Sequence, residues 1–289
     1  MTSVLQPEVQ VRDSLPLATS SSCQVIAVWG SAGSGKTTVA MNLAFEFAQG
    51  GKRTILVDLD TRRPSLAALL GLTSAGPGIT AITRLGRQGR LTAEEVARLS
   101  AELKFGNRSL DVITGLSAPS RWPELDAAGL GETFETLAKE YEVIVIDLND
   151  ELAEGLTSVG SEVDRNFATR FVLDLADQVL GVFAADPVGV NRFLFDAREI
   201  EVEYWPIANR VNTATLGKNP ERQIRQALFE AGKIEPKAIL PIDYAACDWV
   251  QLNAKPLMLQ AKQSKLSIAL HALAMELLDQ SNSALNSGL

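Results

Sequence analysis

The stretch from Gly30 to Thr37 carries the residue types that bind phosphate groups. It reads Gly-Ser-Ala-Gly-Ser-Gly-Lys-Thr and fills every fixed position of the pattern G-x-x-x-x-G-K-[ST]. Its glycines let the backbone turn tightly and direct successive N–H groups inward, which makes an anion site at the start of a helix. The spacing lets Lys36 reach the outer phosphates and lets the Thr37 hydroxyl bind the magnesium ion that bridges them. The sequence therefore predicts a site for a nucleoside triphosphate with Mg²⁺, and its expected loop contacts are Gly30, Ser31, Ala32, Gly33, Ser34, Gly35, Lys36, Thr37 and Thr38.

The residues on both sides of this loop predict a strand and a helix. Val25 to Val28 form a short apolar run that is typical of a buried parallel strand. Val39, Leu43 and Phe47 then recur at helical spacing, and Gly50 follows them as a helix stop. The alternative is a glycine-rich turn that binds nothing. The strand before the loop, the helix after it and the Gly-Lys-Thr offset together disfavour that alternative.

Three aspartates follow predicted strands at positions that suit metal and phosphate chemistry. Asp58 and Asp60 end one β-branched run, and Asp147 ends another. Because the carboxyl ends of parallel strands meet at one edge of a sheet, these side chains should lie near Lys36. We predict Asp58 and Asp147 as metal ligands together with Thr37, and Lys36 and Asp60 as the catalytic residues, Asp60 by orienting a water. The alternatives are a solvated strand end for Asp147 and N-cap or loop carboxylates for Asp58 and Asp60.

Segments of strand and helix character alternate along the chain without a break in composition. Such alternation predicts an α/β fold, with a single doubly wound, mostly parallel sheet and helices on both faces. We predict one P-loop domain over residues 23–280, with flexible tails over residues 1–22 and 281–289. The segment 73–108 is rich in glycine, arginine and short helical pieces, and we expect it to be a surface excursion.

Composition restricts the partners and the compartment. The formal net charge of the 289-residue chain is −8 and no basic stripe is visible, which disfavours direct DNA binding. Cys23 and Cys247 lie far apart and form no metal or disulfide motif. Neither a signal-peptide pattern nor an apolar run of roughly 20 residues is present. We expect a cytoplasmic protein without a transmembrane segment.

Several segments together resemble the ParA/MinD family of deviant-Walker P-loop ATPases. The loop continues as Thr-Thr-Val-Ala-Met-Asn-Leu-Ala, a Val-Asp-Leu-Asp segment ends at Asp60, and a Val-Ile-Val-Ile-Asp strand ends at Asp147. The resemblance implies an ATP- and Mg²⁺-dependent spatial regulator that forms a nucleotide-linked homodimer. It also implies protein partners that read the switch loops and could recruit the chain to the inner face of the membrane or to a cell pole.

Two later pieces agree with an adenine nucleotide. Asn209-Arg210 resembles the family's adenine-reading element, and the segment containing Pro241 and Asp243 resembles its loop over the base. The resemblance implies that these four residues contact the nucleotide. Asn209 also has a physical argument, because a carboxamide can donate to and accept from the adenine edge at once. A guanine-reading Asn-Lys-x-Asp element is absent here, which favours ATP, and the alternative for Asn209 is a cap on the following turn.

Within the family, three pieces resemble the CpaE/TadZ-like branch. They are Thr114–Leu116, Arg121–Leu125 and Ala184–Pro187. That branch is linked to the assembly and placement of Tad-type pili, so the implied process is pilus assembly or localisation, with cell division or partitioning as the other family role.

The chain departs from the family at one position. The family's second lysine lies five residues before the loop lysine, where this chain has Ser31. Serine carries no charge, and a positive group supplied in trans can be worth roughly 10³ to 10⁵ in rate. We therefore predict nucleotide binding and leave hydrolysis open. Arg165 or Arg170 would compensate if either extended toward the nucleotide or a partner subunit, and the alternative is that both are solvated surface arginines.

Two further functions remain open. A binding scaffold without turnover is suggested by Ser31. A P-loop small-molecule kinase is allowed by the loop alone, and its arginine-rich lid would have to be the segment with Arg84, Arg87 and Arg90.

Overall fold

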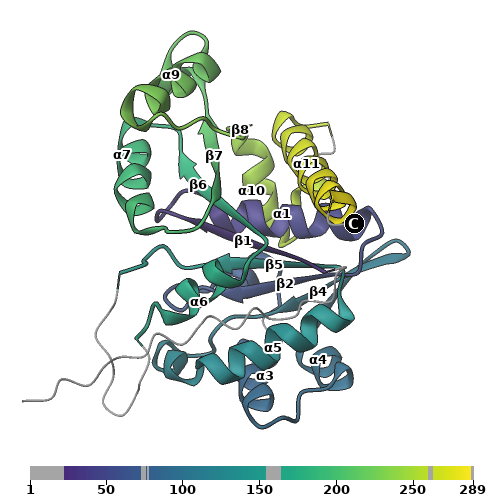
Figure 1. Ribbon diagram of the computed structural model, residues 1–289. Helices are drawn as coiled ribbons and strands as arrows, with labels where there is room; N and C mark the ends of the chain where they lie inside the picture. The colour runs from purple at the N-terminus through teal and green to yellow at the C-terminus, as the bar shows by residue number, and fades with distance from the viewer. Residues whose placement is uncertain (1–22, 73–75, 77, 154–163, 260–262, 288–289) are drawn as a thin grey trace, which may run out of the picture.

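The computed structural model describes residues 23–287 apart from 73–75, 77, 154–163 and 260–262, so the predicted N-terminal tail lies outside the described residues. One eight-stranded sheet has the order β3-β4-β2-β5-β1-β6-β7-β8 (Figure 1). Neighbouring strands are parallel except β3 and β4, which confirms the predicted fold class. The strands are β1 (Gln24–Gly30), β2 (Thr54–Leu59), β3 (Ala101–Phe105), β4 (Arg108–Ile113), β5 (Val143–Leu148), β6 (Gln178–Ala184), β7 (Tyr204–Val211) and β8 (Ala238–Pro241).

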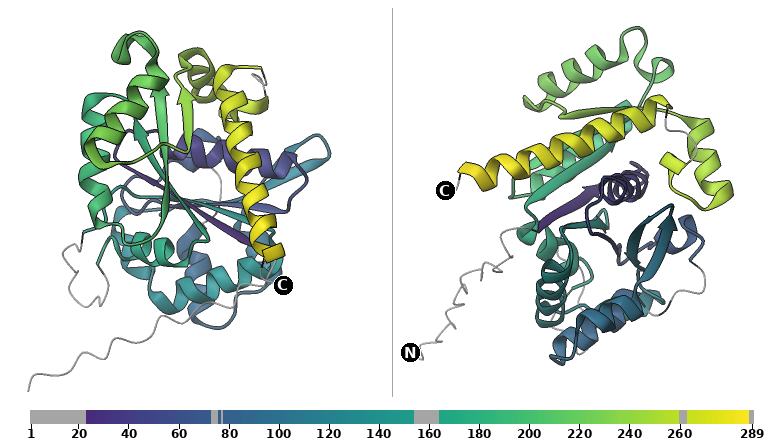
Figure 2. Two further views of the ribbon diagram at one scale, coloured as in Figure 1. Left: turned by 45° about the horizontal axis from the view of Figure 1, so that its top comes forward. Right: turned by 90° about the vertical axis from the view of Figure 1, so that its right-hand side faces the viewer.

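The side chains of β1 alternate between two layers of core. Val25, Ala27 and Trp29 pack with α3, α4, α5, α6, α7 and α9, whereas Ile26 and Val28 pack with α1, α10 and α11 on the other face (Figure 2). Because β1 is buried on both faces, its sequence is a continuous apolar run. The helices are α1 (Lys36–Gln49), α2 (Leu66–Leu69), α3 (Gly78–Arg87), α4 (Ala93–Leu99), α5 (Ala127–Glu140), α6 (Phe167–Leu175), α7 (Pro187–Asp196), α8 (Thr213–Leu216), α9 (Pro220–Gly232), α10 (Tyr244–Asn253) and α11 (Lys265–Ser287), with 3-10 turns at Pro119–Glu124, Ala197–Glu199 and Leu257–Leu259.

The register of the central strands brings the predicted acidic residues together. Val28 of β1 pairs with Asp147 of β5, and Asp147 pairs with Asp58 of β2. The carboxyl ends of these three strands therefore lie level with one another, next to the loop that follows β1.

Three parts of the chain differ from the sequence prediction. The described part of the segment 73–108 contains the expected short helical pieces as α3 and α4, but it also contains the antiparallel edge strand β3, which was not predicted. Helix α10 follows the Pro241 segment, where no helix was predicted. Helix α11 continues to Ser287, past the predicted domain boundary at residue 280.

None of the helices in the described ranges combines the length and the apolar character that crossing a membrane requires.

Candidate nucleotide-binding site

The loop between β1 and α1 has the backbone that the glycine pattern predicts. Gly35 has φ 89° and precedes the first turn of α1 without a side-chain cap, so the N–H groups of that turn remain available for an anion. A Cβ atom on Gly30 would lie 2.0 Å from the carbonyl oxygen of Val182. Only glycine therefore lets the loop pass this close to β6. Thr37 and Thr38 belong to the same first turn of α1.

Lys36 and Asp60 face each other inside the site. The Lys36 Nζ atom lies 3.6 Å from Oδ2 of Asp60, and both side chains are nearly buried. The other oxygen of Asp60, Oδ1, accepts hydrogen bonds from the backbone N–H groups of Arg62 (2.9 Å) and Arg63 (2.8 Å). The loop after β2 thus fixes the carboxylate that holds the lysine, and the two predicted catalytic residues come together.

Asp58 has its oxygens engaged by the same loop. Its Oδ2 accepts hydrogen bonds from the N–H groups of Ser65 and Leu66, both at 3.0 Å, and its Oδ1 accepts one from Asp60 at 3.2 Å. Burial raises the pKa of Asp58 to about 7, and the charge of Asp60 adds to the rise while the N–H groups oppose it. The structure therefore gives Asp58 the loop-closing role that was its alternative, and its part in a metal site stays a prediction.

Asp147 differs from Asp58, because the loop after β2 does not engage its carboxylate oxygens. It is fully buried, and neither of its oxygens has a hydrogen-bond partner of normal geometry among the described groups. Burial and the neighbouring charge of Asp58 raise its pKa well above the usual range, against the effects of Lys36 and the Thr37 hydroxyl. The buried hydroxyl of Ser34 in the loop is also unpartnered. Such groups cost free energy unless a ligand satisfies them.

These residues fit a phosphate chain with Mg²⁺. The described residues contain no group of three or more His, Cys, Asp or Glu side chains arranged to hold a metal ion by themselves. Magnesium at nucleotide sites uses one or two carboxylates or hydroxyls and takes its remaining ligands from phosphates and water. Asp147, with the hydroxyl of Thr37 beside it, supplies such a partial set.

The residues predicted around the base are held by the protein. Asn209 donates from Nδ2 to the carbonyl oxygen of Ser34 (2.8 Å), and its Oδ1 accepts from the N–H of Arg210 (2.8 Å). One N–H and one lone pair of its carboxamide remain. Asp243 caps α10 by accepting from the N–H of Ala246 (3.0 Å), and Pro241 ends β8. Asn209 does not cap a turn, because it fastens the phosphate loop to β7.

A match to a protein-family model shows which family this chain belongs to. The model described as "CobQ/CobB/MinD/ParA nucleotide binding domain" (CbiA) matches residues 25–235, most of the chain, including the loop and the three aspartates. This chain belongs to the CobQ/CobB/MinD/ParA family. The resemblance predicted at family level is therefore confirmed, and the CpaE/TadZ-like branch stays a prediction.

Solved structures of the family share the fold. The ParA family ATPase of Chlorobium tepidum TLS gives a TM-score of 0.71 at 17% identity, over 89% of this chain and 99% of that chain. The septum site-determining protein MinD of Pyrococcus horikoshii OT3, complexed with Mg-ADP, gives 0.64 at 19% identity, over 88% and 95%. At these identities the likeness establishes the fold alone.

Curated relatives match over shorter stretches. The tyrosine-protein kinase CpsD of Streptococcus pneumoniae serotype 4 is 32% identical over 117 residues, which is 40% of this chain and 47% of that protein. The antiactivator FleN of Pseudomonas aeruginosa is 30% identical over 136 residues, which is 47% of this chain and 46% of that protein. The matches thus span about half the length of these relatives.

Ser31, which the resemblance places at the position of the ParA/MinD second lysine, is buried. Its hydroxyl donates a hydrogen bond to Oδ2 of Asp196, at the end of α7, over 3.0 Å. No local pattern predicts the part played by Asp196, because the two residues lie 165 positions apart in the chain. The hydroxyl is therefore used inside the chain.

The two arginines that were candidates for compensation are engaged elsewhere. Arg165 donates from Nη2 to the carbonyl oxygen of Thr61 (3.0 Å), and the Thr61 hydroxyl donates to the carbonyl oxygen of Arg165 (3.0 Å). Arg170 donates to the carbonyl oxygen of Leu152 (2.8 Å) and pairs with Asp164. Both arginines hold the loops after β2 and β5 in place, so the interpretation that either extends toward the nucleotide is not supported.

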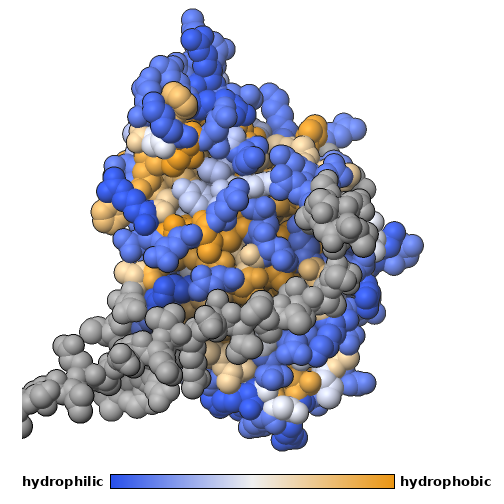
Figure 3. All heavy atoms as spheres, in the orientation of Figure 1, coloured by the Kyte–Doolittle hydropathy of each residue, from blue (hydrophilic) through white to orange (hydrophobic). Residues whose placement is uncertain are grey.

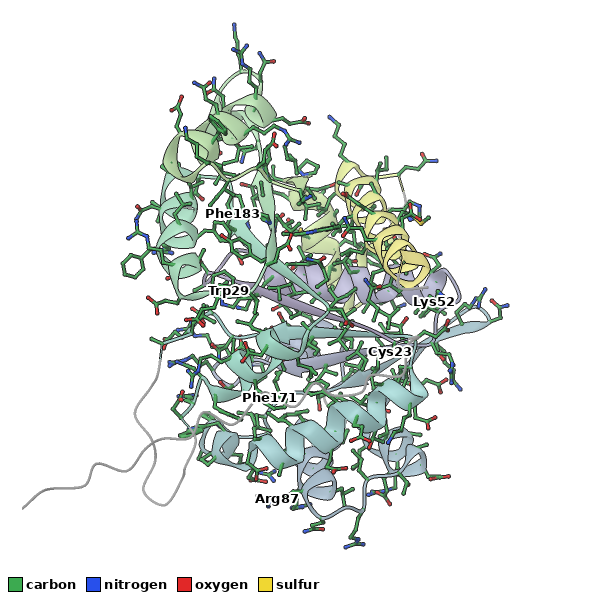
Figure 4. The ribbon with its side chains drawn as sticks, in the orientation of Figure 1. Cys23, Trp29, Lys52, Arg87, Phe171 and Phe183 are labelled. Carbon is green, nitrogen blue, oxygen red and sulfur yellow. The ribbon has the colours of Figure 1, made fainter. Side chains whose placement is uncertain are left out.

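The residues considered for a kinase lid lie away from the loop. Arg87 on α3 pairs with Asp126 at 2.7 Å. In Figure 4 it lies at the outer side of the helical layer, far from Trp29 at the end of β1. A lid over the phosphates would need these arginines at the carboxyl end of β1, so the kinase interpretation loses its main support.

Proposed function

We propose that the protein binds Mg·ATP at the loop Gly30–Thr37 and acts as a nucleotide-dependent spatial regulator of the ParA/MinD type. The observation that carries the proposal is the set of buried polar groups without partners beside this loop, the carboxylate of Asp147 and the hydroxyl of Ser34. Because a buried unpaired group costs about 1–3 kcal/mol, a ligand that satisfies both gains this free energy on binding.

Each residue of the phosphate side has a role in this proposal. Lys36 and the N–H groups at the start of α1 bind the phosphates, and Thr37 and Asp147 would hold the magnesium ion, which offsets phosphate charge when bound. Asp60 keeps Lys36 oriented and is the residue that would orient an attacking water. Asp58 supports this set from the neighbouring strand.

Adenine is the proposed base. The N–H and the lone pair left on Asn209 are enough to donate to and accept from the adenine edge. Arg210, Pro241 and Asp243 would line the same side. Arg210 has φ 61°, in the left-handed region that non-glycine residues rarely adopt, and such strained positions are concentrated at binding sites.

The regulatory role rests on the family and on the missing lysine. Without the charge at Ser31 we propose slow hydrolysis or none, and a homodimer linked to the nucleotide state. Two proteins that are similar to this chain are named for such roles: FleN is an antiactivator, and MinD of Pyrococcus furiosus is a cell division ATPase. Our finer proposal is a role in Tad-type pilus placement, with division or partitioning as the alternative, and recruitment to the membrane or a pole by a protein partner.

Calorimetry and light scattering test the proposal. We expect heat of binding with Mg·ATP at micromolar to millimolar concentrations and weaker binding of Mg·GTP. Light scattering in the presence of ADP or of a non-hydrolysable ATP analogue measures whether the protein is a monomer or a dimer in each nucleotide state. The rate of phosphate release from ATP distinguishes a slow ATPase from a binding scaffold without turnover. Folded protein that gives no heat with millimolar Mg·ATP would overturn the proposal.

A further inference from the structure

Strand β3 ends the sheet, and its outer edge is open in the part of the chain that the structure describes. The hairpin of β3 and β4 projects at the right-hand side in Figure 1, and Figure 3 shows hydrophilic side chains at its tip. The described residues form no hydrogen bond with the backbone groups of β3 that face away from β4. An open edge of this kind is a template for another strand.

The turn between β3 and β4 fixes which backbone groups face outward. Gly106 has φ 61° and is the first residue of a two-residue turn, so Phe105 and Arg108 form the closing hydrogen-bonded pair. Hydrogen-bonded and non-hydrogen-bonded pairs alternate along an antiparallel ladder. The N–H and C=O groups of Glu102 and Lys104 therefore point away from β4, and these two residues set the pairing that the edge can accept.

The charges of these two residues make the edge complementary to itself. Within one chain the Nζ atom of Lys104 lies 3.1 Å from Oε2 of Glu102, and the two side chains are 75% and 47% exposed. If two β3 strands pair in antiparallel fashion about a two-fold axis at Leu103, Glu102 of each copy lies opposite Lys104 of the other. The neighbouring registers place Glu102 opposite Glu102 or Lys104 opposite Lys104, and like charges directly opposite each other are destabilising.

The apolar face of β3 fits the same register. Leu103 and Phe105 are half-buried against the core layer of α1, and the centroid of the Phe105 ring lies 4.3 Å from that of Phe45. Pairing about Leu103 would bring the two Leu103 side chains together and set Phe105 opposite the small Ala101. The core layer would thus continue from one copy into the other.

The neighbour of Glu102 on β4 also favours a cation on its open side. Glu102 lies opposite Asp111, whose Oδ2 accepts a hydrogen bond from the Tyr141 hydroxyl at 2.8 Å. Burial raises the pKa of Asp111 and the charge of Glu102 adds to the rise, while the Tyr141 hydroxyl opposes it. A lysine on the other side of Glu102 would offset this repulsion between like charges.

We propose that a second copy of this chain pairs with β3 in this register and extends the eight-stranded sheet across a two-fold axis. The occupant follows from the order of the charges, because a strand with Glu102 two residues before Lys104 is its own antiparallel complement. Strand β1 is the fifth strand counted from β3, so this contact is separate from the phosphate loop and does not depend on the proposed function. Only five residues of each strand pair, and we expect a weak dimer that forms as the protein concentration rises.

Charge-swap variants test the proposal by sedimentation velocity without nucleotide. Glu102→Lys alone and Lys104→Glu alone place like charges opposite each other, so each should dimerise at least about tenfold more weakly than the wild type. An equimolar mixture of these two variants should dimerise as the wild type does, because each supplies the charge that the other needs. The double variant Glu102→Lys/Lys104→Glu should do so by itself.

A matched control is Lys139→Glu on α5, which reverses an exposed lysine in an ion pair with Glu135. It should leave the dimer unchanged. Calorimetry with Mg·ATP on Lys104→Glu tests the proposed function separately and should give the wild-type affinity.

Cysteine variants measure the register. Leu103→Cys places two thiols opposite each other in a non-hydrogen-bonded pair, where Cα atoms about 4.5 Å apart are within disulfide reach. Under a mild thiol oxidant it should form a covalent dimer. Phe105→Cys faces Ala101 of the other copy and should not, and the wild type with Cys23 and Cys247 gives the background.

Three results would overturn the proposal: a wild type that stays monomeric up to millimolar concentration, single charge variants that dimerise as the wild type does, or a mixture of them that stays monomeric. A monomeric wild type would mean that Glu102 and Lys104 protect the edge from pairing with a second copy and leave it to a strand of a different protein.

Discussion

The candidate site has a phosphate side, formed by the loop Gly30–Thr37 and the aspartates beside it, and a base side that includes Asn209 and Asp243. The polar groups of the two sides differ in how many hydrogen bonds they make within the protein. Beside the loop, the oxygens of Asp147 and the hydroxyl of Ser34 are buried without partners. On the base side, Asn209 fastens the loop and Asp243 caps α10. Both regions were predicted as nucleotide contacts, and only the first contains buried groups without any partner, those of Asp147 and Ser34.

The difference separates residues reserved for a ligand from residues that build the site. An unpaired buried group lowers the stability of the protein, so it is retained where a ligand satisfies it. A residue whose hydrogen bonds are already made contributes mainly by holding other groups in position. Substitutions on the two sides should therefore change stability and ligand affinity in different proportions.

The largest effect is expected from Lys36→Ala. Removing the ammonium takes away charge-assisted contacts to the phosphates and leaves the carboxylate of Asp60 without its partner, so Mg·ATP should bind about 100-fold more weakly by calorimetry. Lys52→Ala is the control, because Lys52 lies beyond the far end of α1 and pairs with Glu142 (Figure 4). Equal affinities of the two variants would contradict the assignment of the phosphate side.

Asp147→Asn should separate stability from binding. In the folded wild type, the raised pKa of Asp147 keeps its carboxyl protonated at pH values where the same carboxyl is ionised in the unfolded chain. Ionisation in the unfolded chain therefore lowers the free energy of unfolding of the wild type as the pH rises above about 4. The variant lacks this loss, and its advantage in urea unfolding without nucleotide should be larger at pH 8 than at pH 5. The factor by which Mg²⁺ increases the affinity for ATP should be about tenfold smaller in the variant than in the wild type. Asp248→Asn, at an exposed position, is the control, and an equal stability difference at both pH values would contradict the expectation.

Asn209→Ala tests the base side. Because its carboxamide holds the Ser34 carbonyl, we expect binding of Mg·ATP, Mg·GTP and inorganic triphosphate to weaken together by about tenfold, with a further few-fold loss for Mg·ATP. Asn212→Ala, which removes the cap of α8, is the matched control. A loss confined to Mg·ATP would mean that Asn209 acts by reading the base alone, and the contrast between the two sides would fail.

The sequence predicted what contiguous residues determine. The phosphate loop, β1 and α1 depend on neighbours in the chain, so glycine spacing and apolar periodicity were sufficient. The alternation of strands and helices likewise predicted a mostly parallel sheet, and parallel pairing then placed Asp58 beside Asp147.

The rest depended on contacts between distant residues. The hydrogen bond from Ser31 to Asp196 spans 165 positions and that from Asn209 to Ser34 spans 175, and no local pattern marks either one. Strand β3 did alternate between half-buried and exposed residues, as an edge strand does, but it is short and lies within a segment rich in glycine and arginine. The loop-closing hydrogen bonds of Asp58 were foreseen only as an alternative to metal binding, because the same carboxylate suits both roles.

The smallest effects, and the sharpest contrast, come from two serines of the same loop. Ser31→Ala removes a hydrogen bond that the protein uses and leaves the carboxylate of Asp196 less satisfied, so the free energy of unfolding should fall by about 1 kcal/mol. Ser34→Ala removes a buried hydroxyl that has no partner, so stability should stay the same or rise slightly, while Mg·ATP affinity falls a few-fold. Each variant is the control for the other, with urea unfolding and calorimetry as the two readouts. If Ser34→Ala lowered stability as much as Ser31→Ala does, its hydroxyl would serve the fold and would not be reserved for phosphate, because a group kept for a ligand contributes nothing to the ligand-free protein.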